Sequence, residues 1–149
     1  RSIEVELLRR ITVLICNCGG TQQLWQQEHH PLPPTFVVHN ATSLSPPESC
    51  SITPTIRSFG SHHDYKSADW LAGAVSTLPF DIEIFGSWNS ETPPPPNLRI
   101  NAPVSAPQLA TVMNSSQALL LCLGDNIFGQ YLSSPLKLWD YLASIAKSL

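Results

Sequence analysis

The chain has little charge and no long apolar run. Only 13% of its 149 residues are charged, about half the usual share, and no Lys or Arg occurs between Arg10 and Arg57. Binding to nucleic acid depends on a concentrated basic surface, so we expect no nucleic-acid partner. The longest apolar run, residues 118–123, is far shorter than the roughly 20 residues of a membrane helix. We therefore expect no membrane partner.

Signals for a cell compartment are also sparse. The first residues lack the basic start and apolar stretch of a signal peptide, and there is no initiator Met, which predicts a fragment or a processed product. Two glycosylation sequons, at 40–42 and 114–116, would matter only in a secreted protein. An even number of cysteines permits two disulfides, but buried free thiols in a reducing cell are the simpler interpretation; these cysteines are Cys16, Cys18, Cys50 and Cys122.

What the sequence does contain is an alternation of strand-like and helix-like segments. Branched residues at 11–16, alternation at 81–86, a short segment at 98–100 and the apolar run at 118–123 predict strands. The length fits a single domain over 1–149. The alternation predicts an α/β fold, a partly parallel sheet with flanking helices that resembles half of a Rossmann fold. Helices are predicted over 65–77 with Asp64 as N-cap, over 106–114 with Ser105 as N-cap, and over 135–148.

Prolines and histidines gather in the remaining segments. Residues 21–63 hold all five histidines and two proline clusters, which predicts a long, partly ordered loop with short strands at 35–39 and 51–57. Pro54 favours a sheet edge for the second of these strands. Residues 92–97 form a proline spacer in which Pro93 to Pro96 are consecutive. Segment 3–7 fits either a strand or a helix.

Two of the predicted strands end in residues that suit a nucleotide site. In an open α/β sheet, ligands bind beyond the carboxyl ends of the strands. Gly19, Gly20 and Thr21 follow strand 11–16, and backbone N–H groups in glycine turns can cradle phosphates. Asp125 follows strand 118–123, where a carboxylate can hold Mg²⁺ together with a nucleotide's phosphates. The alternative is that both segments are ordinary turns.

The sequence of the second strand end carries a family resemblance. Residues 123–130, LGDNIFGQ, resemble the LGDNIFYG motif of sugar nucleotidyltransferases of the glucose-1-phosphate thymidylyltransferase type, with one tyrosine missing. Strand 11–16 followed by Gly19-Gly20-Thr21 is similar to that family's first strand and nucleotide loop. The resemblance implies that Asp125 binds the metal and that the Gly-Gly-Thr segment binds the nucleotide. In an active enzyme a sugar 1-phosphate would attack the nucleotide α-phosphate and release pyrophosphate.

The sequence departs from that family in its basic residues. Gln22 or Gln23 replaces the loop arginine, and residues 11–56 contain no cation that could stabilise a triphosphate. The chain is also about half the size of such an enzyme. We therefore expect a degenerate or truncated relative that binds a nucleotide with Mg²⁺. The alternative is a non-catalytic interaction domain whose prolines Pro93 to Pro96 dock into an SH3- or WW-type groove.

Other constellations favour less specific interpretations. Cys16 and Cys18 with His29 and His30 lack the usual spacing of a zinc site. His62 and His63 are expected to be solvated loop residues. Asp81 and Glu83 share one strand face, which predicts a solvated face more readily than an acid–base pair. Residues 84–88 are similar to the strand-to-turn segment of polymerase-beta-type nucleotidyltransferases, but the metal-binding aspartates of that family have no counterpart.

Overall fold

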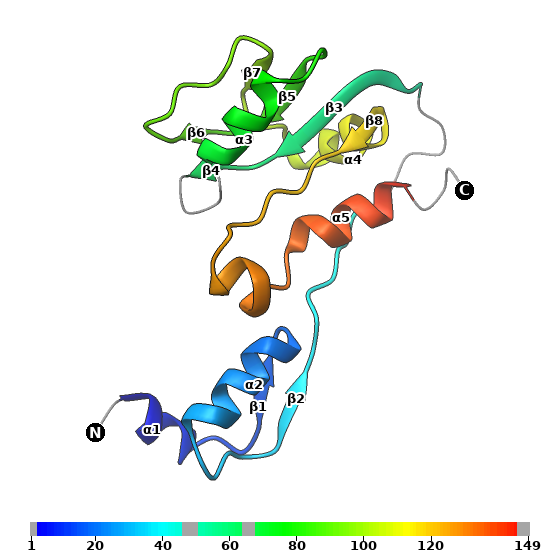
Figure 1. Cartoon of the computed structure of the whole chain (residues 1–149). Helices are drawn as coiled ribbons and strands as arrows, with labels where there is room; N and C mark the ends of the chain where they lie inside the picture. Colours follow the sequence, from blue (N-terminus) through cyan, green and yellow to red (C-terminus); the bar gives the residue numbers. More distant parts are fainter. Residues whose placement is uncertain (1–2, 46–50, 64–67, 146–149) are drawn as a thin grey trace. The chain divides into compact units, whose positions relative to one another are not determined.

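The computed structural model describes residues 3–45, 51–63 and 68–145, and these form two compact units (Figure 1). Unit 1 comprises Arg1–Asn40 and Asn126–Pro135, and unit 2 comprises Ala41–Asp125 and Leu136–Leu149. Most contacts within the chain fall inside one or the other of these units, and the single domain expected from the sequence stays a prediction.

Unit 2 is built on a parallel four-stranded sheet. Its strands are β3 (Thr53–Phe59), β5 (Ile82–Phe85), β7 (Leu98–Asn101) and β8 (Ser116–Leu119), in the spatial order β7-β5-β3-β8. The three strand pairs are all parallel, with Ile56 beside both Ile82 and Ala118. This confirms the predicted α/β class with a parallel sheet and flanking helices.

Helices cover both faces of this sheet. On one face, α3 (Ala68–Ser76) packs Leu71 and Val75 against Ile82 and Ile84 of β5. On the other face, α4 (Ala106–Asn114) and α5 (Leu136–Ile145) contribute buried Met113 and Tyr141, which cluster with Phe59. Side chains of a strand alternate between its two faces. Strand β5 therefore contributes Ile82 and Ile84 to the cluster beneath α3 and Phe85 to the cluster around Phe59.

The helices of unit 2 agree with the sequence-based predictions to within a few residues. Helix α4 has the predicted bounds, and Ser105 is its N-cap, although the Ser105 hydroxyl donates to Gln108 Oε1 rather than to the backbone. Helix α5 begins one residue later than predicted. Asp64, the expected N-cap of α3, lies outside the described residues, as does the end of the predicted helix 135–148. Strands β5 and β7 confirm the predictions at 81–86 and 98–100.

Two predictions about strand environment are wrong. Pro54 does not mark an edge strand, since β3 lies between β5 and β8. The sheet tolerates the missing N–H because pairing with β8 is irregular between Thr53 and Ile56, and pairing with β5 begins only at Ile56. Strand β8 is parallel, but it spans Ser116–Leu119 and shares only residues 118 and 119 with the predicted strand 118–123. It lies at the sheet edge, where its residues are half-buried or exposed.

Short pairings extend the strand ends of unit 2. Strand β4 (His62–His63) follows β3 and pairs in parallel with β6 (Trp88–Asn89), which follows β5. The proline spacer comes next, and residues 90–97 form neither helix nor strand. Asn97 fixes its end, because the Asn97 side-chain amide donates to the carbonyl oxygens of Val75 and Leu78 at 2.7 and 3.1 Å.

Unit 1 contains a small parallel β-α-β arrangement. Strands β1 (Leu14–Cys16) and β2 (Thr35–Val37) pair in parallel, and helix α2 (Gly19–Glu28) connects them. Helix α1 (Ile3–Leu8) precedes β1, so the ambiguous first segment is helical. A π-helix, η2 (Phe128–Leu132), completes the unit. No helix in the part of the chain that the structure describes is long and apolar enough to cross a bilayer.

The structure corrects two predictions in unit 1. Residues 21–28 belong to a helix rather than to a loop, because Gln and Leu are good helix formers and the first turn of α2 packs against η2. The strand predicted over 11–16 is only three residues long. Its Ile15 side chain is 64% exposed, since α2 covers only one side of a two-stranded sheet.

Candidate functional site

The predicted nucleotide segment lies in the first turn of α2 and packs closely against η2. A Cβ on Gly20 would stand 1.9 Å from the carbonyl oxygen of Tyr131, whereas a Cβ on Gly19 would meet no atom within 4 Å. Gly20 is therefore required by a close approach of two backbone segments within unit 1. That requirement explains this glycine without a ligand.

The side chains beside Gly20 are also engaged with η2. The Thr21 hydroxyl lies 3.1 Å from Asn17 Oδ1 and 3.3 Å from the carbonyl oxygen of Leu132, both acceptors for its proton. Cys18 donates its thiol proton to the carbonyl oxygen of Tyr131 at 3.2 Å. The polar groups of this turn thus hold α2 to η2, and phosphate binding at Gly19, Gly20 and Thr21 remains a prediction.

Asp125, the predicted metal ligand, belongs to unit 2 and is exposed. The predicted nucleotide residues belong to unit 1, so the two halves of the predicted site belong to different units. Its neighbour Asn126 has a local structural role, since Asn126 Oδ1 accepts the N–H of Gly129 at 2.9 Å as η2 begins. Among the described residues, no three His, Cys, Asp or Glu side chains gather as a metal cluster.

The carboxyl edge of the four-stranded sheet holds an arrangement that sequence reasoning missed. Strands β3 and β5 both end in Phe-Gly-Ser, at 59–61 and 85–87, and the two copies lie side by side. The Phe59 and Phe85 rings stack with centroids 5.3 Å apart, and Ser87 Oγ donates to Ser61 Oγ at 2.9 Å. The repeated tripeptide was the available signal in the sequence.

Glycine is required at the centre of each copy. Gly60 has a φ of +95°, a conformation that L side chains rarely adopt, and its N–H donates to the carbonyl oxygen of Phe85 at 2.8 Å. A Cβ on Gly86 would stand 2.2 Å from the carbonyl oxygen of Gly60. The two strand ends therefore meet backbone to backbone.

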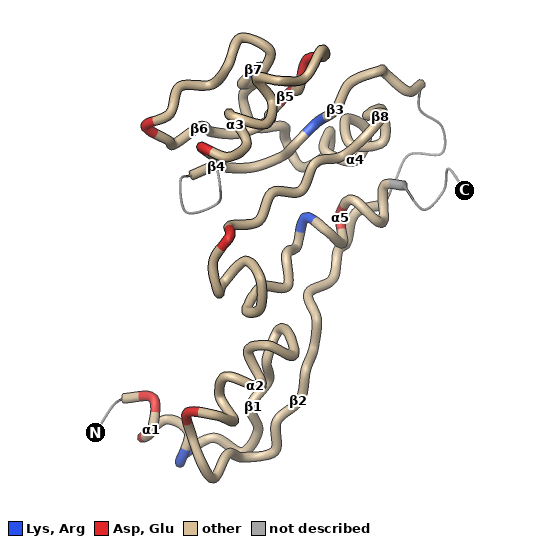
Figure 2. Tube along the Cα trace, viewed as in Figure 1, with Lys and Arg blue, Asp and Glu red and all other residues tan. Residues whose placement is uncertain are grey.

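A cation lies directly at this edge. A Cβ on Gly60 would be 2.9 Å from both Cε and Nζ of Lys137, so the ammonium group of α5 reaches the end of β3. Lys137 is in the first turn of α5, where the helix dipole disfavours a positive charge. Figure 2 shows the lysine and arginine positions in blue and the acidic positions in red along the trace, with one blue segment in α5. The Lys137 charge thus lies at the end of α5 where the helix dipole is also positive.

Buried polar groups surround the strand ends. Burial raises the pKa of the Cys122 thiol, and the positive charge of Lys137 partly offsets this increase. Burial likewise raises the pKa of Tyr141, whose hydroxyl accepts the N–H of Phe59 at 3.1 Å. Ser58 Oγ lies 3.1 Å from His62 Nε2, and both residues are buried. The prediction of a solvated His62 is wrong, because the residue is buried and its ring stacks on the Trp88 ring, with centroids 6.1 Å apart.

The acidic residues singled out on the predicted strand 81–86 form ion pairs, and the cysteines Cys16 and Cys18 are buried. Glu83 does not face solvent, since its carboxylate accepts a hydrogen bond from Arg57 Nε at 2.8 Å in a mostly buried ion pair. Asp81 pairs with Arg99 at an exposed position. Cys16 and Cys18 are free thiols and both are buried. Cys50 lies outside the described residues.

Comparisons of the chain with protein-family models, with curated proteins and with solved structures found no match. The topology and chemistry of unit 2 are therefore the basis on which a function can be assigned.

Proposed function

We propose that unit 2 is a nucleotide-binding domain whose ligand lies at the carboxyl edge of the sheet, between β3 and β8. The strand order is the observation that carries this proposal. From β3 the chain proceeds outward through β5 to β7, and β8 then returns to the other side of β3. The loops after β3 and β8 therefore leave in opposite directions, which opens the crevice where doubly wound sheets of the Rossmann type bind ligands.

The charge at this edge favours an anionic ligand. The ammonium group of Lys137 and the positive end of the α5 dipole come from the same helical turn. A phosphate bound at this edge would accept a charge-assisted hydrogen bond from Lys137 and would interact favourably with the helix dipole.

The proposal includes Mg²⁺ only as a cation that accompanies the nucleotide. Mg²⁺ in proteins often takes one or two carboxylates, with phosphates and waters as its other ligands. Asp125 supplies one exposed carboxylate, and the described residues form no further cluster of acidic or imidazole ligands. This donor set suits a cation carried in by phosphates, and the chemistry it would supply is charge neutralisation. Nucleotidyl transfer to a sugar 1-phosphate is not part of the proposal.

The test is calorimetric titration of the full chain with dTTP, ADP and inorganic diphosphate, each with and without MgCl₂. We expect saturable binding, and Lys137→Gln should weaken it about tenfold or more, as loss of a charge-assisted hydrogen bond implies. Arg99→Gln is the matched control, because it also removes one positive charge but from an exposed pair. Absence of binding by all three compounds, or equal affinities of the two variants, would reject the proposal.

The exposed prolines support a second candidate function, docking into an SH3- or WW-type groove. Pro93, Pro94 and Pro96 are exposed. The segment is held at both ends, since Trp88 Nε1 donates to the carbonyl oxygen of Thr92 at 2.8 Å and Asn97 is fixed against α3. An extended, pre-ordered proline segment loses little entropy on binding. Titration with isolated SH3 and WW domains tests this, and Pro94→Ala with Pro96→Ala should abolish any binding observed.

A further inference from the structure

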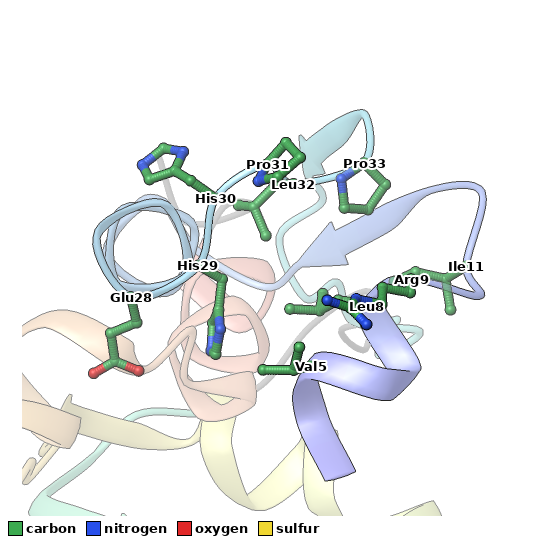
Figure 3. Close-up of a pocket in the computed structure, with 10 residues that line it drawn as sticks. All are labelled: Val5, Leu8, Arg9, Ile11, Glu28, His29, His30, Pro31, Leu32 and Pro33. Atoms are coloured by element: carbon green, nitrogen blue, oxygen red, sulfur yellow. The ribbon is translucent and has the colours of Figure 1, made fainter. Parts of the chain in front are cut away.

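We infer that unit 1 carries a second binding site, for a small organic monocarboxylate with an apolar body. The site is a hollow of about 530 Å³ bounded by α1, the end of α2 and the segment that follows it (Figure 3). This volume is within the range of small-molecule pockets, roughly 300–1,000 Å³. None of the predicted nucleotide or metal residues lines it, so it is independent of the function proposed for unit 2.

Apolar side chains form much of the wall. Val5 and Leu8 come from α1, and Leu32 comes from the proline-bounded segment opposite. Figure 3 shows Val5 between the side chains of His29 and Arg9. Such a wall provides a surface on which a hydrocarbon or aromatic body can be removed from water.

Arg9 supplies the charge that a carboxylate needs. Its neighbour Arg10 is neutralised by Glu6, with Nη2 2.8 Å from Oε1. Arg9 forms no such pair with any residue that the structure describes, and its side chain lines the hollow. The guanidinium group can donate two parallel hydrogen bonds to one carboxylate, which makes arginine a specific partner for this group.

His29 adds a held donor or acceptor on the facing wall. Its backbone N–H donates to the carbonyl oxygen of Trp25 at 3.0 Å, and its ring lies 4.9 Å from the Trp25 ring. Both contacts limit the freedom of the imidazole before a ligand enters. Figure 3 shows His29 and Arg9 on opposite sides of the space.

The charge of the lining favours a monoanion over a dianion. Glu28 lies at the border of the same hollow and has no ion-pair partner among residues 3–45, 51–63 and 68–145. Arg9 and Glu28 contribute one positive and one negative charge to the lining. A carboxylate can pair with Arg9 alone, whereas a phosphate monoester brings a second negative charge toward Glu28.

The experiment uses the full chain and 3-phenylpropionate as the probe, followed by ligand-observed NMR and calorimetry. We expect a Kd on the order of 1 mM, typical of a ligand of this size. The uncharged 3-phenylpropionamide should bind at least about tenfold more weakly, because it offers Arg9 no charge. Phenyl phosphate should also bind more weakly than the carboxylate.

Two neighbouring variants provide the matched control. Arg9→Gln should weaken 3-phenylpropionate binding about tenfold, whereas Arg10→Gln removes the same charge from a pair outside the hollow and should leave the Kd unchanged. Equal effects of the two variants would overturn the inference, as would equal binding of the acid and the amide or no saturable binding. Tighter binding of phenyl phosphate would overturn the assignment of a monocarboxylate.

Discussion

Gly86 and Gly60 lie so close that a Cβ on Gly86 would stand 2.2 Å from the Gly60 carbonyl oxygen. The contact joins the ends of two parallel strands at the edge where the nucleotide is proposed to bind. Its position follows from the β3–β5 register, in which Phe59 lies opposite Phe85 and the two glycines come next.

Gly86→Ala should destabilise the protein by at least about 2 kcal/mol, because the new methyl group must displace backbone rather than a flexible side chain. Urea denaturation followed by circular dichroism measures this loss. The control is Gly73→Ala in α3, where a Cβ meets nothing within 4 Å. That variant should gain about 0.5–1 kcal/mol, since alanine favours helix more than glycine does. A tolerated Gly86→Ala would contradict the strand-end contact.

Removal of the Glu83 carboxylate should cost about 2–3 kcal/mol, because Arg57 would lose its partner in a largely buried position. Arg57 also donates to Ser115 Oγ at 2.9 Å, so the guanidinium would remain held inside unit 2. Glu83→Gln in urea denaturation provides the measurement. Asp81→Asn breaks an exposed pair and should cost below about 1 kcal/mol. A similar loss of stability in both variants would contradict the claim that the Arg57–Glu83 pair is buried and the Arg99–Asp81 pair exposed.

Gly20→Ala should destabilise unit 1 by at least about 2 kcal/mol, since a Cβ would meet the Tyr131 carbonyl oxygen at 1.9 Å. Gly19→Ala changes the same chemical group one residue earlier and should shift stability by less than about 0.5 kcal/mol. Limited proteolysis of the segment after α2, together with urea denaturation, would report the loss. If the two variants behave alike, the close packing of α2 against η2 is not what requires Gly20.

Stability should fall at alkaline pH. Burial raises the pKa of Cys16 and Cys122 above 9.0 and that of Tyr141 above 10.0. The unfolded chain therefore loses these protons first, and unfolding is favoured progressively as the pH rises above about 9. Thermal melts between pH 7 and 11 measure the effect. Tyr141→Phe should reduce the slope above pH 10, and an unchanged slope would exclude Tyr141 as a contributor.

Local patterns were sufficient to predict several elements of unit 2. Ile82 and Ile84 alternate with polar residues, and both point into the core beneath α3. Ser105 followed by Pro107 marks the start of α4, because proline suits the first helical turn. Such patterns depend only on residues close in sequence, so they predict these elements without any knowledge of the tertiary structure.

The candidate site could not be predicted in the same way. The importance of Gly60 and Gly86 becomes visible only when β3 and β5 lie in register, and Lys137 of α5 approaches Gly60 alone. Helix α2 was missed because its glutamines give it little amphipathic pattern, and its packing partner η2 lies about a hundred residues later. Strand β1 pairs with β2, so the predicted nucleotide turn does not join the sheet that leads to Asp125.

The interior position of β3 also has a consequence for how the chain folds. Ile56 pairs with Ile82 on one side and with Ala118 on the other, so one edge of this strand finds its partner much later in synthesis. Contacts between residues distant in sequence slow folding, and an unpaired strand edge invites association with other chains. A ribosome-bound chain that ends before β8 should therefore need a chaperone to stay unaggregated. That need should end once residues 116–119 have emerged from the ribosome and can pair with β3.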